Sequence, residues 1–177
     1  NNETGILQPI RKIVESCGAG IPVHSDAVQV VGKQKVHFHE LGVASLSFSA
    51  HKFHGPKGVG FAFVKKNTQL GSFITGGMQE KGFRAGTESV HNIYGMSEAL
   101  KISLNNLSKE KQYVSEIKSY FISKISNEIE NIKFNGNSAD LSKSTYTLVN
   151  VLLPVDKITG GLFMFKLDMK GIACSKG

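Results

Sequence analysis

The fold of this chain is decided by the stretch Phe48-Ser49-Ala50-His51-Lys52-Phe53-His54-Gly55-Pro56-Lys57-Gly58. An apolar run from Val43 to Phe48 leads into it and has the length of a short buried strand. Lys52 therefore lies just beyond a strand end, where open α/β sheets place their binding and catalytic groups. Most lysines are solvated surface charges, so this position leaves two interpretations open, a surface cation and a nucleophilic amine.

A second strand end, upstream in the chain, carries an acid. Ile21 to Val23 has the pattern of a short buried strand entered from Gly20, with Asp26 at its far end. Two neighbouring strand ends would bring this carboxylate and the Lys52 amine to one crevice. A carboxylate for a pyridinium nitrogen and a lysine for an aldehyde are the two groups that a pyridoxal phosphate site requires. The acid would keep the ring nitrogen protonated, and the lysine would anchor the cofactor and move protons.

Several ordered motifs resemble those of one family. They are Asp26 with Gln29, Ser49-Ala50-His51-Lys52 followed by Gly55-Pro56-Lys57-Gly58, Gly76-Gly77-Met78-Gln79-Glu80-Lys81-Gly82-Phe83-Arg84-Ala85-Gly86-Thr87, and the end segments Asn1 to Gly5 and Ile172 to Gly177. Together they resemble the cysteine desulfurases of the iron–sulfur assembly type, within the class V aminotransferase-like family. The resemblance extends over essentially the whole chain.

The resemblance implies an α/β fold of the aspartate aminotransferase-like kind, fold type I, with a mostly parallel sheet. Residues 1–104 would form the second part of the cofactor-binding large domain, and residues 105–177 part of a small α+β domain. The chain is expected to be an internal or C-terminal fragment, inactive by itself. In the family, the cysteine that forms the persulfide lies a few residues beyond the position of Gly177.

The same resemblance implies which residues bind the cofactor. Lys52 would hold pyridoxal phosphate, and Asp26 would face the ring nitrogen. Gln29 and Asn2 would hydrogen-bond the phenolic oxygen. The phosphate would be held by Ser49 and His51. The amine of Lys52 reacts only when neutral, so burial or neighbouring cations are expected to favour that form.

Two further residues each have two interpretations. Thr87 would, by resemblance, reach the cofactor phosphate of the other subunit of a homodimer, and it could also be the N-cap of the helix that follows it. His24 lies two residues before Asp26, so on an extended strand both side chains share one face. It could support the carboxylate in catalysis or be a satisfied core histidine.

The activity implied by the resemblance is the removal of sulfur from L-cysteine, which leaves L-alanine and an enzyme persulfide. The sulfur would pass to a scaffold protein for iron–sulfur clusters or to a tRNA-modifying partner, in the cytoplasm. Two alternatives remain open. One is a different substrate on the same cofactor, as in selenocysteine lyases or other class V aminotransferases, and the other is a non-enzymatic interaction module.

Composition and charge agree with a globular domain. Of 177 residues, 40% are hydrophobic and 20% charged, and no apolar run is long enough to predict a membrane span. The net charge of +7 is spread along the chain without interleaved aromatic residues, which favours a solvated basic surface over direct nucleic-acid binding.

The cysteines and histidines do not predict a metal site. Cys17 and Cys174 lie far apart in the sequence and are expected to be free thiols with packing roles in a reducing compartment. His37 and His39 can share a face of an extended segment, but with Glu40 as the one nearby acid they form a poor zinc signature.

Periodicity and turn residues predict the remaining elements. A helix runs from Pro9 to Cys17 and ends at Gly18, an exposed connection covers Val30 to Leu41, and a strand covers Gly58 to Val64. Later elements are helices at Glu88–Leu104 and Lys109–Ile129, a turn at Asn135–Ser138, a strand at Tyr146–Leu153, a helix at Ile158–Met169 and a short strand into Cys174. The second long helix would pack on a sheet through one apolar stripe formed by Val114, Ile117, Phe121, Ile125 and Ile129.

Overall fold

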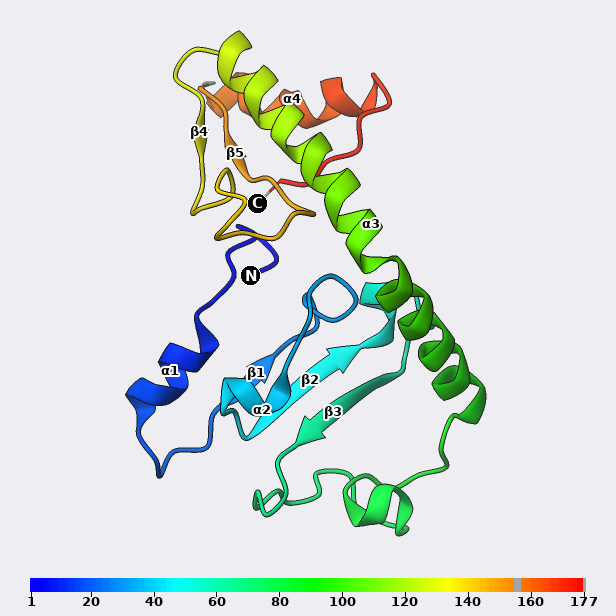
Figure 1. Ribbon diagram of the computed structural model, residues 1–177. Coiled ribbons are helices and arrows are strands. Elements are labelled where there is room, and N and C mark those ends of the chain that lie inside the picture. The colour runs from blue at the N-terminus through cyan, green and yellow to red at the C-terminus, as the bar shows by residue number, and fades with distance from the viewer. Residues whose placement is uncertain (155–156, 177) are drawn as a thin grey trace. The chain divides into compact units, whose positions relative to one another are not determined.

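The computed structural model describes residues 1–154 and 157–176 and divides into two compact units (Figure 1). One unit comprises residues 9–110, and the other combines residues 1–8 with residues 111–177. The sequence predicted a division after residue 104, with the first residues in the earlier domain. In the structure residues 1–8 belong to the later unit because they pair with it: the Leu7 N–H donates to the Lys143 carbonyl and the Thr145 N–H to the Gly5 carbonyl.

The unit of residues 9–110 contains a three-stranded sheet in the order β1 (His24–Asp26), β2 (Ser45–Ser49) and β3 (Gly60–Val64). β1 and β2 are parallel, with Asp26 opposite Ser47. β2 and β3 are antiparallel, because the connection between them is too short for the crossover that a parallel pair needs. The expected mostly parallel sheet is therefore mixed in these strands.

The first strand differs from its prediction. Ile21 is 61% exposed, and the ladder with β2 begins only at His24. Pro22 has no N–H to donate to a ladder, so the chain joins the sheet first through the Val23 carbonyl, which accepts from the Ala44 N–H at 2.8 Å. The strand thus lies three residues later than the predicted Ile21–Val23, and Asp26 is its last residue.

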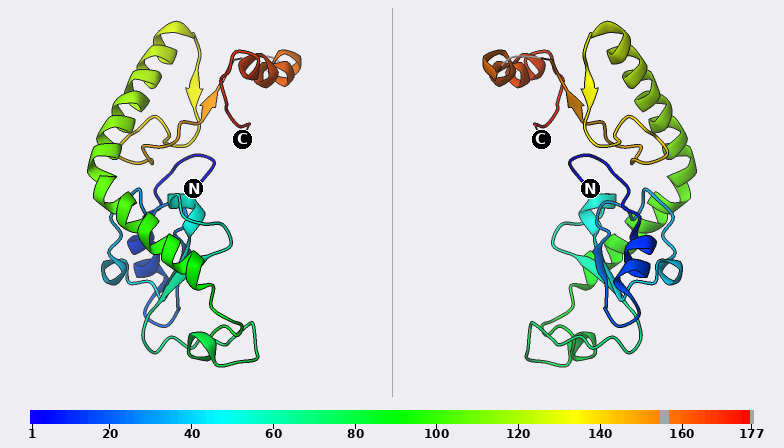
Figure 2. Two further views of the ribbon diagram at one scale, coloured as in Figure 1. Left: turned by 90° about the vertical axis from the view of Figure 1, so that its right-hand side faces the viewer. Right: turned by 90° about the vertical axis from the view of Figure 1, so that its left-hand side faces the viewer.

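The core of this unit lies on one face of β2. Leu46 and Phe48 alternate with half-buried serines and are almost completely buried, and the Phe48 ring stacks on Phe61 of β3 with centroids 4.5 Å apart. Burial of each such side chain stabilises the fold by about 2 kcal/mol. Two helices flank the sheet, α1 (Ile10–Cys17) and the first part of α3 (Val90–Glu128), as Figures 1 and 2 show.

The connection between β1 and β2 is not the exposed segment that was expected. It contains the short helix α2 (Phe38–Leu41), and Val31 and Gly32 within it are buried. Phe38 and Leu41 pack against the core cluster, because a crossover between parallel strands must cover one face of the sheet.

The two long helices predicted at Glu88–Leu104 and Lys109–Ile129 form the single helix α3. Residues 105–108 contain no glycine or proline, and Leu107 is buried, so nothing breaks the helix there. The predicted apolar stripe is also displaced. Ile117 and Phe121 are exposed, whereas the inward side of the later part carries the buried Lys118.

The unit of residues 1–8 and 111–177 contains a two-stranded antiparallel pair, β4 (Lys133–Phe134) and β5 (Val151–Leu152), and the helix α4 (Lys157–Asp168). The predicted strand Tyr146–Leu153 is reduced to β5. The short strand expected before Cys174 is replaced by a turn, in which the Ile172 N–H donates to the Leu167 carbonyl and so closes α4.

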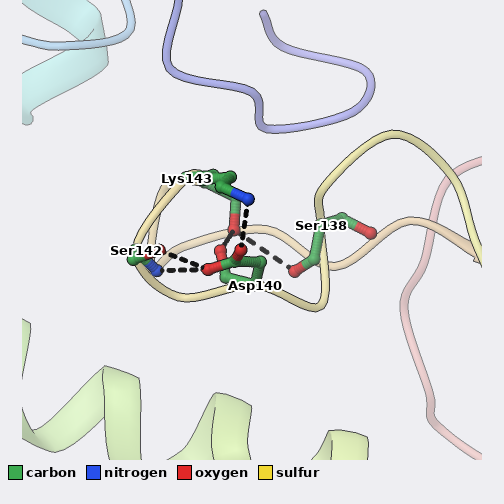
Figure 3. A network of polar contacts seen from close by, with 5 residues as sticks. Ser138, Asp140, Ser142 and Lys143 are labelled. Atoms are coloured by element: carbon green, nitrogen blue, oxygen red, sulfur yellow. Dashed lines mark hydrogen bonds and ion pairs between the residues drawn. The ribbon is translucent and has the colours of Figure 1, made fainter.

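A polar turn follows the predicted and observed turn at Asn135–Ser138. Figure 3 shows its centre, where the Ser142 hydroxyl and N–H donate to Asp140 Oδ1 at 2.6 and 2.8 Å. Lys143 Nζ lies 3.3 Å from the other carboxylate oxygen. The Ser142 hydroxyl and then its N–H lower the pKa of Asp140, with a smaller contribution from Lys143. This network holds the turn in which the Ser144 hydroxyl faces α3.

Lys118 on α3 is 3% exposed and donates to Ser144 Oγ at 2.7 Å and to the Thr145 carbonyl at 2.8 Å. We expect Lys118→Met to lower the free energy of unfolding by about 1–3 kcal/mol, because buried acceptors lose a charged donor. Urea unfolding measures this, with the exposed Lys111→Met as the matched control. Equal stability of the two variants would contradict a structural role for the ammonium.

The pH dependence of this effect has a definite sign. Burial lowers the pKa of Lys118, and Asp140 partly offsets the shift. Between the lowered pKa and 10.5, the unfolded chain binds more protons than the folded chain, so the wild type gains stability as pH rises. The Met variant lacks this increment, and the difference in unfolding free energy between the two proteins therefore changes across that alkaline range.

Candidate functional site

The predicted acid and amine lie at the same edge of the sheet. Asp26 is the last residue of β1, and Lys52 follows the last residue of β2 by three positions. Since the two strands are parallel and adjacent, their carboxyl ends meet at one edge. The ladder continues past the strand end, where the Ala27 N–H donates to the Ser47 carbonyl at 2.9 Å. The two strand ends are therefore held together by backbone hydrogen bonds.

Lys52 is carried by a rigid turn, the 3₁₀-helix η1 (Ala50–Phe53). Ala50 and Phe53 on either side are 0% and 2% exposed, while Lys52 is half-buried. The Ala50 N–H donates to the Val59 carbonyl, and the Ser103 hydroxyl on α3 donates to the Phe53 carbonyl at 3.3 Å. The turn is thus anchored in the core at both ends, which fixes where the lysine side chain begins.

The backbone after Lys52 requires a glycine at position 55. His54 adopts the left-handed conformation with φ of 68°, and the Gly55 N–H returns to the Ala50 carbonyl at 2.9 Å. A Cβ on Gly55 would lie 2.9 Å from the Cβ of Ala50, which is closer than such atoms approach. Only glycine fits the tight return of the chain.

The Asp26 carboxylate is oriented by its own backbone. Its Oδ1 accepts from the Val28 N–H at 2.8 Å, in the local turn typical of aspartate. Its Oδ2 makes no hydrogen bond within residues 1–154 and 157–176, and the side chain is exposed. One oxygen is therefore used to fix the carboxylate and the other is available to a ligand.

His24 shares the β1 face with Asp26, as expected, but its ring bonds elsewhere. Nδ1 lies 2.8 Å from the Ser45 hydroxyl and Nε2 lies 3.5 Å from the Ser47 hydroxyl, both on β2. The imidazole is exposed, so it is not a core histidine. These contacts cross between strands rather than along β1, and they turn the ring toward β2 instead of toward the carboxylate.

Gln29 lies just beyond β1 and has a partner that the sequence analysis missed. Lys33 Nζ lies 3.4 Å from Gln29 Oε1 in a partly buried setting. Burial, and next the positive charge of Lys52, lower the pKa of Lys33, while Glu110 acts in the opposite direction. Lys33 is thus a second cation beside Lys52. The spacing of Gln29 and Lys33 by four residues was the available signal for this contact.

Four other predicted residues are placed in different ways. Ser49 and His51 bracket the start of η1 at the shared sheet edge, and within the described chain neither side chain forms a hydrogen bond. Thr87 is exposed, and it is not the N-cap of α3, because the Ile93 N–H returns to Ser89. Asn2 belongs to the other unit, where its amide donates to Glu3 at 3.1 Å. Its predicted role stays a prediction.

The glycine-rich segment before Thr87 is ordered by side chains. The Gly86 N–H donates to Gln79 Oε1 at 3.2 Å, and Arg84 Nη1 donates to the Gly86 carbonyl at 2.8 Å. Phe73 and Met78 in the same segment are 97% and 79% exposed. The segment is therefore built by polar contacts from its own residues, with apolar side chains directed outward.

The donor set at the sheet edge fits pyridoxal phosphate. Asp26 presents a carboxylate oxygen for a protonated ring nitrogen, and Lys52 an amine for an aldehyde. Ser49 and His51 present a hydroxyl and an imidazole for a phosphate, and Gln29 an amide for a phenolic oxygen. All five residues lie in the strand ends and connections of one unit, so this part of the chain carries the residue types that the ring nitrogen, aldehyde, phosphate and phenolic oxygen of the cofactor need.

Other kinds of site find no support in the described residues. They contain no group of three or more His, Cys, Asp or Glu side chains placed to hold a metal ion. No helix among them is both long and apolar enough to cross a membrane. Both cysteines are free, as expected. Cys174 is exposed beside the Met164 sulfur at 3.8 Å, so the predicted packing role is wrong for this residue.

Comparison with known proteins gives one consistent result. The family profile described as aminotransferase class-V matches residues 1–177. The chain is 37% identical to the cysteine desulfurase IscS of Dictyoglomus turgidum over 178 aligned positions, which cover all of this chain and 44% of that protein. The chain thus spans less than half the length of this curated relative.

Solved structures agree with the family match. A NifS-like protein superposes with a TM-score of 0.87 at 34% identity, over all of this chain and 47% of the other. A NifS-like protein from Rickettsia africae superposes with a TM-score of 0.84 at 28% identity, over all of this chain and 48% of the other. The predicted α/β fold of type I is confirmed by these matches.

Proposed function

Because the chain belongs to the class-V aminotransferase family, we propose that it carries the lysine and the aspartate of a pyridoxal phosphate-dependent cysteine desulfurase. The observation that carries the proposal is the position of Asp26 and Lys52 at the carboxyl ends of two adjacent parallel strands. Enzymes of this family use pyridoxal phosphate, and the polar groups at this edge match its ring nitrogen, aldehyde and phosphate.

Each residue at the edge has a defined task. The cofactor, when bound, supplies an electron sink for the electrons left on the substrate Cα. Lys52 holds the cofactor and then moves the Cα proton as a general base and acid. Asp26 keeps a proton on the ring nitrogen through its free oxygen, while the Val28 N–H fixes the other. Ser49 and His51 donate to the phosphate and so hold the ring in register with the lysine.

The atoms and electrons of the proposed reaction balance. L-cysteine loses its sulfur and becomes L-alanine, and a thiol of the protein, R–SH, takes up that sulfur and becomes the persulfide R–S–SH. The electron pair of the carbon–sulfur bond stays with the carbon, and this carbon binds a proton where the sulfur was attached. In this proposal Lys52 delivers the protons to the substrate carbon, and the burial of Ala50 and Phe53 on either side supports its turn.

The partners follow from the same proposal. The substrate is L-cysteine, and the protein acts as a cytoplasmic homodimer in which Thr87 contacts the cofactor phosphate of the other subunit. Asn2 adds a second hydrogen bond to the phenolic oxygen. The persulfide sulfur passes to an acceptor protein. Thr87 lies at the exposed end of the ordered glycine-rich segment, a position from which a side chain can contact a neighbouring chain.

The experiment that tests the activity uses protein from the complete reading frame, loaded with pyridoxal phosphate and given L-cysteine with a thiol reductant. We expect alanine and sulfide to form in equal amounts, because the reductant releases the persulfide sulfur. Selenocysteine, given in parallel, distinguishes a lyase for that amino acid, which would leave L-cysteine unchanged. Protein that acquires no visible cofactor absorbance would instead indicate an interaction module and overturn the proposal.

A further inference from the structure

Lys33 is a half-buried cation close to the candidate site, and the proposed reaction assigns it no task. It lies in the segment after β1, which approaches the Lys52 turn closely. Gly32 is buried with φ of +77°, and a Cβ at that position would lie 2.8 Å from the Cβ of Phe53. Lys33 follows Gly32 and Lys52 precedes Phe53, so this close approach brings the two lysines near each other.

The contact between Lys33 and Gln29 has a consequence for the amide. An ammonium group has three donors and no acceptor, so the amide must turn its oxygen to Lys33. The distance of 3.4 Å is long for a hydrogen bond, but the reversed amide would set two N–H groups against a positive charge. The amide nitrogen of Gln29 therefore points away from Lys33 and is free to donate.

We propose that Lys33 is a positioning residue of the cofactor site, which orients the Gln29 amide as a donor and places a second positive charge beside Lys52. The inference rests on the proposed function, because Gln29 needs its donor for the phenolic oxygen of pyridoxal phosphate. Lys33 touches neither the substrate nor the reacting atoms, and it acts through these two neighbours. A merely structural lysine would have no such effect on the ligand.

The positive charge of Lys33 also lies close enough to Lys52 for the two amines to interact electrostatically. Their mutual repulsion, after burial, lowers the pKa of Lys33 itself. Glu110 on the packed helix acts on Lys33 in the opposite direction, and the turn and the sheet edge also carry His51, His54 and Asp26.

The test uses protein from the complete reading frame, stripped of cofactor and titrated with pyridoxal phosphate. We expect Lys33→Met to raise the Kd for the cofactor about tenfold, since a charge-assisted contact and the donor orientation are lost. The visible band of the bound cofactor should change with pH at a higher pH than in the wild type, because a nearby positive charge is removed. Lys33→Arg should restore most of both properties, and Lys35→Met, an exposed neighbour, should change neither.

A second variant separates the proposed effect of Lys33→Met from a general loss of folding. Gln29→Leu should weaken cofactor binding by a similar factor, and the double variant should be no weaker than Gln29→Leu alone, because both changes remove one interaction. If wild-type protein binds the cofactor and shows the band, but Lys33→Met behaves as Lys35→Met or the two losses add fully, the inference is wrong and the proposed function stands. Wild-type protein without any band would overturn both.

Discussion

Lys52→Ala is expected to reduce sulfide release from L-cysteine at least about 10³-fold and to abolish the visible absorbance of the bound cofactor. The variant loses both the amine that anchors the cofactor and the group that moves the Cα proton, and general acid–base catalysis by one side chain contributes about 10²–10⁴-fold by itself. The substitution leaves Ala50 and Phe53 in the core, so the turn keeps its anchors. Absorption spectra and sulfide assays of the complete protein measure the two effects.

Lys66→Ala is the matched control for that experiment. Lys66 is exposed and follows β3, whose last residue Val64 pairs with Ser45 at the amino end of β2. It therefore lies at the opposite edge of the sheet from Lys52. We expect this variant to retain the cofactor band and the activity. A Lys52→Ala protein that keeps the band would show that another amine holds the cofactor, and the assignment of Lys52 would be withdrawn.

Asp26→Asn is expected to reduce turnover about 10²–10³-fold while the protein still folds. An asparagine oxygen can accept from the Val28 N–H as Asp26 Oδ1 does, so the local turn survives. An amide, however, carries no negative charge to keep a proton on the ring nitrogen, and the ring then withdraws electrons poorly. The measurement is kcat with L-cysteine, together with the absorption spectrum of the bound cofactor.

Asp26→Glu and Asp168→Asn complete this comparison. The glutamate restores the charge with a longer side chain and should recover part of the turnover. Asp168, exposed at the end of α4 in the other unit, makes the same change of charge in a residue to which the proposed reaction assigns no task, and this variant should leave turnover unchanged. An Asp26→Asn enzyme as active as the wild type would argue that the carboxylate does not face the ring nitrogen.

Much of the local structure could be predicted from neighbouring residues alone. Pro9 and Gly18 mark the ends of α1, and the alternation of Leu46 and Phe48 with serines marks β2. Such signals are local because capping residues and side-chain period act within a few residues of the element they define. The apolar runs before them placed Asp26 at the far end of one strand and Lys52 just past the end of another, and both residues have these positions in the structure.

Other predictions failed where distant contacts decide. The long helix α3 continues through residues 105–108, between the two helices that were predicted there, and Leu107 in that stretch is buried. His24 bonds to Ser45 and Ser47, which lie next to it only because β1 pairs with β2. The strand predicted at Tyr146–Leu153 shortens to two residues, since the preceding chain pairs with Gly5 instead.

The sequence alone determines which chemical groups the chain carries and near which strand ends they lie. How those groups are oriented is a property of the packed molecule. The carboxylate, the amine and the amide become one site because parallel pairing aligns two strand ends and because Gly32 lets the chain approach Phe53. Lys33 becomes a neighbour of Lys52 through that approach, and an electrostatic interaction between residues 19 positions apart depends on distance in space, which the linear order of residues does not contain.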